Sequence, residues 1–313
     1  MNPNQPYECC NIQPRWMTRR EVLKSVSAGF GWLAFQGLST QLAAAENKNP
    51  LAPKAPHFPA KAKRVIFLAM QGGPAHMDTF DYKPKLTADS GKPGNGKGGR
   101  LFGSPFQFAQ HGQSGLWISE LFPNVAKHAD ELCLLRGMHT DIPNHPQAFV
   151  QMHTGSSQFT RPSMGAWTFY GLGTENENLP GFITISPPLA LGGAQNFGAA
   201  FLPAIYQGTR LGEQKADLGT ASIGNIRNPD GRDHNAKGYT MWMAGGGVRG
   251  GLSYGSTDDY GAKAVENPVH VHDLHATVLA LLGLDHEKLT FRYAGREFRL
   301  TDVSGKVVKA IMA

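Results

Sequence analysis

An aspartate and a histidine stand side by side in the loop that precedes an apolar hexapeptide. Asp233 and His234 are followed by the run at 239–244 and then by three glycines. A turn, a short apolar run and a second turn are typical of a buried strand with a loop at each end. Carboxylate oxygen and imidazole nitrogen both bind zinc-like ions, so the pair is a candidate metal site. The alternative is that Asp233 caps a turn and His234 is solvated.

A second group of chemically capable side chains follows the apolar run at 64–70. That run predicts a strand in the centre of a parallel sheet, buried on both faces. The turn at 71–74 ends it, and His76, Asp78 and Asp81 follow. Ligand sites in open α/β sheets form where loops leave the carboxyl ends of strands, so these residues stand where a site is expected. Capping of a turn or helix is the alternative role for Asp78.

A third candidate is the pair Asn144 and His145. An apolar run at 131–136 predicts a short strand, and residues 146–155 predict a helix with proline in its first turn. Asn144 and His145 would lie at that helix N-terminus, where free N–H groups and the helix dipole favour an anion. His153 lies about two turns further along the helix, so we expect it to be structural.

Three histidines crowd the start of a helix predicted at 269–284. His270, His272 and His275 lie within six residues, beside Asp273. Such a cluster suggests metal binding, but side chains at this helical spacing point in different directions. Asp273 is also a good helix cap. We therefore expect structural roles here and consider a metal role the weaker alternative.

The composition limits the class of protein. The chain has 313 residues, of which 41% are hydrophobic, with 38 glycines and 21 prolines, so we expect a sizeable core and many loops. The net charge is +6, but the sequence shows no basic stripe with interleaved aromatic residues, which argues against nucleic acid as a partner. Three cysteines, Cys9, Cys10 and Cys133, do not make a disulfide framework.

Residues 1–45 have the pattern of a twin-arginine export signal. Arg19 and Arg20 are followed by a weakly apolar run at 25–42 and by alanines at 43–45. Glycines interrupt the run, so we expect no stable membrane span after cleavage. The expected partner is the twin-arginine (Tat) export machinery, and the destination is the periplasm or cell surface. The alternative is an ordinary amphipathic helix. Residues 46–63 are rich in proline, alanine and lysine and predict a linker.

Further along the chain, several segments carry clear secondary-structure signals. The spacing predicts helices at 119–128 and 163–172, a short strand at 182–185, and a hairpin at 291–300 that turns at Ala294 and Gly295. A turn and an edge strand are expected at 301–308. Buried strands followed by helices indicate an α/β fold.

Five stretches together resemble the DUF1501 proteins, which are exported, sulfatase-like members of the alkaline phosphatase superfamily. The last two are the most specific, and their order agrees with the family. The resemblance covers most of residues 64–313, which would form the main domain. The stretches are GGPAHMDTFD at 72–81, NHPQAFVQMHTG at 144–155, GRDHNAKGYTMWMAGGGVRGG at 231–251, ENPVHVHDLHATVLALLGLDHEKL at 266–289 and RYAGREFRLTDVSG at 292–305.

The resemblance implies a three-layer α/β/α sandwich with a mostly parallel sheet. It also implies divalent metal ions, zinc or manganese, at the carboxyl edge of that sheet. Such enzymes hydrolyse sulfate or phosphate esters of small molecules or polysaccharides, and a Ser, Thr or formylglycine side chain attacks.

Carried over residue by residue, the resemblance gives roles to six positions. Asp78 resembles an early metal ligand, and Asn144 and His145 occupy the usual place of the attacking residue. Asp217, in Asp-Leu-Gly-Thr, resembles the start of an acidic-Phe-Gly-Arg-Thr motif. Asp233 and His234 resemble the late metal ligands. The side chains of Asp78, Asp217 and His234 should therefore converge.

The chain departs from the family pattern in two respects. Only residues 211–216 separate the Gly-Thr-Arg sequence at 208–210 from Asp217, where family members carry a further strand and helices. The domain is therefore expected to be shortened and its sheet incomplete, with the strands at 65–70, 132–136 and 239–244 closing the gap. No Ser, Thr or Cys stands at the attacking position. The two expected functions are a metal-dependent ester hydrolase and a non-catalytic exported binding or structural protein that retains the fold.

Overall fold

The computed structural model describes residues 49–70, 73–94, 99–176, 179–187, 190–212 and 234–313. The chain divides into two compact units, Met1–Pro50 and Leu51–Ala313, and all of the described helices and strands belong to the second. The predicted export signal at 1–45 lies outside the described residues, as do the candidate ligands Asp217 and Asp233.

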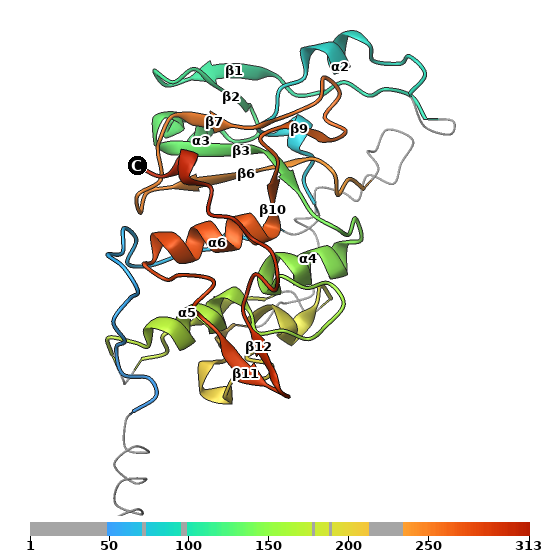
Figure 1. Ribbon diagram of the computed structural model, residues 1–313. Coiled ribbons are helices and arrows are strands. Elements are labelled where there is room, and N and C mark those ends of the chain that lie inside the picture. Colours follow the sequence, from blue (N-terminus) through green and yellow to red (C-terminus); the bar gives the residue numbers. More distant parts are fainter. Residues whose placement is uncertain (1–48, 71–72, 95–98, 177–178, 188–189, 213–233) are drawn as a thin grey trace, which may run out of the picture. The chain divides into compact units, whose positions relative to one another are not determined.

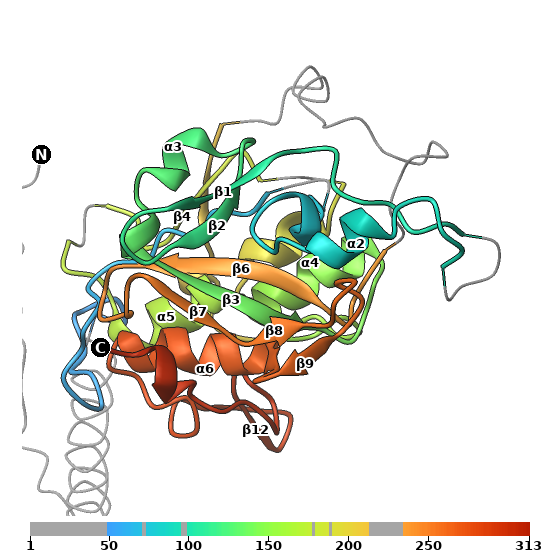
Figure 2. The ribbon, with the colours of Figure 1, turned by 90° about the horizontal axis from the view of Figure 1, so that it is seen from above.

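A mixed four-stranded sheet forms the centre of this unit, and β3 (Leu132–His139) is its middle strand (Figures 1 and 2). Strand β6 (Tyr239–Ala244) pairs with β3 in antiparallel register, with Leu132 opposite Ala244. Strands β7 (Leu252–Tyr254) and β10 (Val269–His270) pair with β3 in parallel register, at its beginning and its end. Residues 132–135 are all buried, as expected for a strand covered on both faces.

Alternate residues of β3 enter two separate cores. Cys133 and Leu135 pack with residues of helices α5 (Met164–Leu172) and α6 (Val271–Leu281). Leu132 and Leu134 face the opposite way and pack with Ile118 and other residues around the hairpin of β1 (Phe108–His111) and β2 (Leu116–Ser119). The period of two in a strand therefore divides the hydrophobic residues between the two faces of the sheet.

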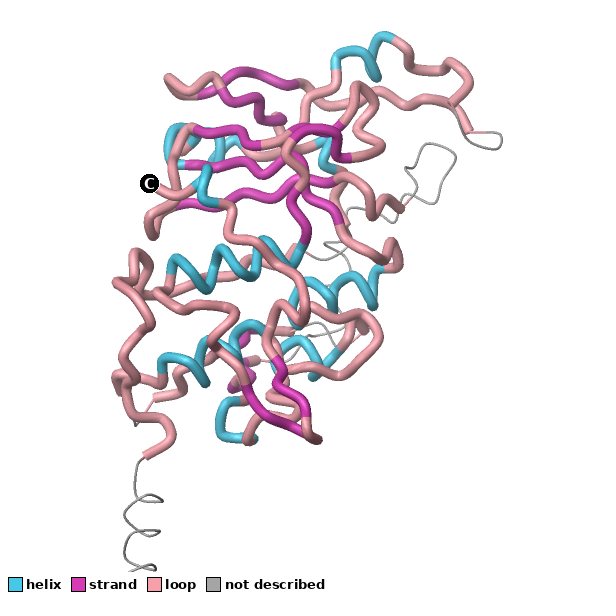
Figure 3. The backbone as a smooth tube through the Cα atoms, in the orientation of Figure 1, coloured by secondary structure: helices cyan, strands magenta, loops and turns pink. Residues whose placement is uncertain are grey.

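Three helices lie on one side of the sheet, and the β1–β2 hairpin with α3 (Pro123–Ala126) lies on the other (Figures 1 and 3). Helix α6 is next to the sheet, with α4 (His145–Thr154) and α5 beyond it in the view of Figure 1. Helix α5 begins where predicted because the Ser163 hydroxyl accepts a hydrogen bond from the Ala166 N–H. This arrangement places the start of α4 close to the end of β3.

Smaller elements complete the unit. The hairpin predicted at 291–300 is confirmed: its two strands turn at Ala294 and Gly295, which both have positive φ as a two-residue turn requires. The remaining elements are α2 (Pro84–Ala88), the parallel pair β4 (Ile183–Ile185) and β5 (Thr209–Leu211), the antiparallel pair β8 (Ser256–Thr257) and β9 (Ala264–Glu266), the hairpin strands β11 (Phe291–Tyr293) and β12 (Arg296–Phe298), and the 3-10 turns η1 (His76–Asp78), η2 (Ala129–Glu131), η3 (Gly193–Phe197), η4 (Ala204–Tyr206) and η6 (Lys309–Ile311).

The predicted strands at 132–136 and 239–244 are confirmed, whereas the strand predicted at 64–70 is wrong. In the described part of the chain, residues 64–70 form no strand and no backbone hydrogen bond. Ile66 and Leu68 are 86% and 66% exposed, and only Phe67 packs against the core. Both edges of β3 are already occupied, so this apolar run does not reach the central strand.

Three smaller predictions also need correction. The helix predicted at 269–284 begins only at Val271, because Val269 and His270 pair with β3 as β10. The helix predicted at 119–128 is reduced to the four residues of α3. At 301–308 the predicted turn is present at 301–303, but no strand follows it. The α/β prediction is confirmed, with both parallel and antiparallel strand pairs. Among the described residues, no helix combines the length and apolar character needed to span a membrane.

Candidate functional site

The N-terminus of α4 lies just beyond the end of β3. Asn144 is its N-cap, with extended backbone angles, and proline follows within the first turn. The Asn144 side chain is exposed and makes no capping hydrogen bond. The first N–H groups of a helix have no partners within the helix, so this end of α4 has the donors and the dipole that attract an anion.

The rings of His145 and His234 contact each other at this end of α4. Their centroids are 4.4 Å apart and the ring planes meet at 76°. The sheet explains why residues so distant in sequence meet. Tyr239, at the start of β6, lies opposite Met138, near the end of β3. The segment leading into β6 and the segment leaving β3 therefore lie at the same end of the sheet.

The loop that carries Asp78 also approaches His145. A Cβ atom on Gly73 would lie only 2.8 Å from His145 Cε1, and Gly73 has a φ of +61°. Glycine is therefore required here both for the close approach and for the backbone conformation. Asp78 is half-buried at the end of η1, whose first residue, His76, pairs through Nε2 with the Gly261 carbonyl at 3.1 Å.

Asp81, three residues further along, belongs to a buried charge cluster. Its side chain is fully buried, with Lys83 Nζ at 3.1 Å and Arg136 Nη1 at 3.7 Å. The Thr257 hydroxyl donates a hydrogen bond to Asp81 Oδ2. The cluster joins the η1 region to β3 and β8 and has a structural role. Asp81 was identified from the sequence but its partners were not, although Arg136, a cation at the end of an apolar run, was a signal that an acid lies nearby.

The histidines of α6 hold α6 against the C-terminal end of α4. His272 Nε2 and His275 Nε2 each lie 2.7 Å from a backbone carbonyl, that of Gly155 and that of Met152. Burial lowers the pKa of His275 to about 3, so its imidazole is neutral. Its Nε2–H group donates a hydrogen bond to the Met152 carbonyl. The Asp273 carboxylate accepts from the His270 N–H in a capping box. These contacts confirm the predicted structural roles.

A second polar group lies where the parallel strands β3 and β10 end together. The rings of His139 and His270 are 5.1 Å apart, and His270 Nε2 lies 3.4 Å from Asp141 Oδ2. Gln151 of α4 donates to Asp141 and accepts from the Thr140 hydroxyl. Burial, with the nearby Asp141 charge, raises the pKa of the Tyr239 hydroxyl, so it stays protonated. The hydrogen bonds of Gln151 fix α4 to the segment that leaves β3. Neither Gln151 nor Tyr239 was identified from the sequence.

Among the described residues, His145 from the expected attacking position and His234 from the expected metal ligands are in contact. Within this described part of the chain, no group of three or more His, Cys, Asp or Glu side chains is arranged to hold a metal ion, and Asp78 does not complete such a group with the two histidines. Asp233 directly precedes His234 in the chain, and both it and Asp217 lie outside the described residues. The site that the structure describes therefore consists of the imidazole pair, the loop of Asp78 and the start of α4.

Comparison with known families identifies the group to which these residues belong. The family model described as "Protein of unknown function (DUF1501)" matches residues 62–229 and 220–312. The chain belongs to the DUF1501 family. Asp78, Asn144, His145 and Asp217 fall in the first matched segment of this DUF1501 protein, and Asp233 and His234 fall in the second. No curated protein and no solved structure matches the chain.

Proposed function

We propose that this DUF1501 protein is an exported, metal-dependent hydrolase of sulfate or phosphate esters, with its centre at His145 and His234. The observation that carries the proposal is the contact between these two rings, 4.4 Å apart. The resemblance to sulfatase-like proteins gave the two residues separate roles, one in the attacking position and one as a late metal ligand. Because the two rings are in contact, the attacking position and the late metal-ligand position are adjacent.

Imidazole nitrogen and carboxylate oxygen are donors that suit a zinc or manganese ion. Two imidazoles bound to one zinc ion at about 2.0–2.1 Å have ring centroids roughly 5 Å apart, which is close to the observed separation. Asp233 adds a carboxylate next to His234, and Asp78 and Asp217 are the remaining proposed ligands. A divalent ion held by these residues would supply Lewis-acid chemistry to an ester oxygen.

The chain itself supplies binding and orientation. The N–H groups at the start of α4 bind the sulfate or phosphate oxygens, assisted by the helix dipole. Residues 143–146 are Pro-Asn-His-Pro and carry no hydroxyl or thiol, so water rather than a side chain is the attacking group. The Asn144 amide would orient the anion, and the His145 imidazole, at the position that the resemblance gives to the attacking residue, would hold the ion together with His234.

The wider architecture is part of the same proposal. We assign the mixed sheet and its helices to a shortened, alkaline-phosphatase-like three-layer sandwich. The family match consists of two segments that overlap at 220–229, a little beyond the short connection at 211–216. This break supports the absence of the strand and helices that family members carry between these parts. The arginine pair and apolar run within residues 1–45 support export by the twin-arginine route to the periplasm or cell surface.

The experiment combines metal titration with turnover. The full chain is titrated with Zn²⁺ and Mn²⁺ by calorimetry and assayed with aryl sulfate and aryl phosphate. Removing a residue that hydrogen-bonds to a metal ligand lowers metal affinity by about 10–100-fold. Removing a ligand itself, as in His145→Ala or His234→Ala, should therefore lower metal affinity at least as much. The control is His128→Ala, an exposed histidine that pairs with Glu131. Metal affinity unchanged in both site variants rejects the proposal.

A non-catalytic exported binding or structural protein is the second candidate. The observation that favours it is the lack of an attacking hydroxyl or thiol at residues 143–146. This function predicts that the double variant Asp233→Ala, His234→Ala folds normally and binds as much metal as the unchanged chain. It also predicts no turnover of either aryl ester at any metal concentration. Metal-dependent turnover by the unchanged chain excludes it.

A further inference from the structure

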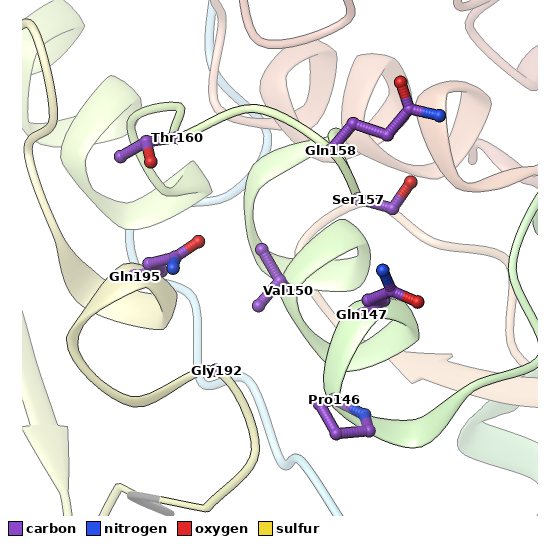
Figure 4. Close-up of a pocket in the computed structure, with 8 residues that line it drawn as sticks. All are labelled: Pro146, Gln147, Val150, Ser157, Gln158, Thr160, Gly192 and Gln195. Carbon is purple, nitrogen blue, oxygen red and sulfur yellow. The ribbon is translucent and has the colours of Figure 1, made fainter.

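A shallow pocket of about 260 Å³ opens between α4, the segment that follows it, and η3 (Figure 4). We propose that this pocket is the subsite for a neutral sugar ring of the substrate, which makes the substrate a carbohydrate ester. Three glutamines line it, Gln147, Gln158 and Gln195, together with the hydroxyls of Ser157 and Thr160. Figure 4 shows Gln195 on one side of Val150 and Gln147 on the other.

The chemistry of the lining matches that of a sugar. None of the lining residues carries a charge. Each glutamine amide and each hydroxyl can both donate and accept hydrogen bonds. The lining can therefore pair with sugar hydroxyl groups whether these donate or accept. Val150 and Pro146 add an apolar surface for the C–H face of the ring. The volume lies below the range of about 300–1,000 Å³ for drug-sized ligands, which suits one or two rings.

Close packing around Gly192 and Asn196 fixes one wall of the pocket. Asn196 is only 5% exposed, and its Nδ2 donates to the Leu191 carbonyl at 2.6 Å. Its Oδ1 is buried and accepts no hydrogen bond in the described part of the chain. A Cβ on Gly192, which lines the pocket, would overlap Val150 Cγ2 and lie 2.9 Å from Asn196 Oδ1. Glycine at 192 therefore lets Val150 pack directly against the η3 loop, and this close packing shapes one side of the pocket.

The pocket is adjacent to the proposed centre. Pro146 and Gln147 directly follow His145 in the first turn of α4. One turn of helix rises about 5.4 Å, so a sugar bound here would lie within reach of an ester group at the start of α4. The charged ester group would occupy the helix N-terminus, and the neutral ring the pocket. This assignment rests on the proposed hydrolase function.

The test measures sugar binding by the full chain with saturation-transfer NMR. The probes are D-glucose, D-galactose, N-acetyl-D-glucosamine, maltose and cellobiose, each measured separately. We expect saturation transfer to at least one of them, with at least tenfold weaker binding in Gln147→Leu and Gln195→Leu. Gln110→Leu is the matched control, because Gln110 is an exposed glutamine on β1, which lies on the other side of the sheet from α4 in Figure 1.

Two results overturn the subsite: no transfer to any of the five sugars, or transfer that is unchanged in both glutamine variants while circular dichroism shows intact folding. The same sugar titration on His234→Ala shows whether sugar binding depends on the proposed metal ligand His234. Sugar binding without any metal binding or turnover by the unchanged chain rejects the hydrolase and leaves a carbohydrate-binding pocket. Metal-dependent turnover of aryl esters without sugar binding rejects the subsite and leaves the hydrolase.

Discussion

Several polar residues of this protein hold the fold together. The buried histidines of α6 donate to carbonyls of α4, and buried Asp81 is paired with Lys83 and Arg136. These contacts account for the positions of these side chains within the fold without any ligand. The rings of His145 and His234 contact each other at the N-terminus of α4, and the proposed function rests on this pair.

The buried His275 makes stability depend on pH. Its pKa is about 3 in the folded protein, below the usual value of 6.5. Between these values the unfolded chain binds a proton that the folded chain does not, so stability falls as pH falls below about 6.5 and is steady above it. The free energy of unfolding should fall by about 1.4 kcal/mol per pH unit in this window from His275 alone. The unfolding free energy of His275→Gln, measured by urea denaturation at several pH values, should change less steeply with pH, by that amount per pH unit. An identical pH dependence in the two proteins contradicts the lowered pKa of His275.

The charge cluster around Asp81 gives a second prediction at this scale. Asp81→Asn leaves Lys83 and Arg136 without their buried counter-charge, which should cost about 3–5 kcal/mol of unfolding free energy. Asp259→Asn is the control, because its pair with Lys85 is exposed and should change stability little. Urea denaturation of both variants measures the difference. Equal effects would show that burial does not strengthen the Asp81 contacts.

At the scale of elements, the sequence predicted those whose signals are local. Prolines begin α4, Ser163 begins α5, and the Ala-Gly turn sets the hairpin at 291–300. The segment at 64–70 could not be predicted in this way. An apolar run indicates only that burial would be favourable, whereas a strand also needs a free edge to pair with. Likewise, the contact of His145 with His234 depends on the antiparallel pairing of β3 and β6, which no spacing along the chain reveals.

The corrected position of residues 64–70 predicts an unusual tolerance to substitution. Ile66→Ser should change the unfolding free energy by less than about 0.5 kcal/mol, because Ile66 is almost fully exposed. Leu134→Ala, in the middle of β3, should cost about 2–5 kcal/mol through the cavity that it leaves. Thermal and urea unfolding of the two variants provide the comparison. A large loss in Ile66→Ser would mean that the run is buried after all.

At the scale of the whole molecule, the proposed export rests on the N-terminal sequence. Residues 1–45 fused to a reporter should direct it across the membrane by the twin-arginine route, because paired arginines precede an apolar run and small residues. The double variant Arg19→Lys, Arg20→Lys should retain the reporter in the cytoplasm, although the charge is unchanged. Fractionation of cells that express both fusions provides the measurement. Equal export of the two fusions contradicts this route.

The whole fold brings the end of β3, the start of α4 and the segment before β6 to one end of the sheet, and the proposed function depends on that meeting point. The family match shows which proteins share this sequence but assigns them no activity. The most direct evidence would therefore come from the proposed metal site.

X-ray absorption spectroscopy of the zinc-loaded full chain tests the centre most directly. We predict nitrogen ligands at about 2.0–2.1 Å with the outer-shell scattering of two imidazoles. His145→Ala and His234→Ala should each remove one imidazole contribution, and His128→Ala should remove none. A zinc shell without imidazole, or one that is the same in all three variants, would contradict the central claim that His145 and His234 bind one ion together.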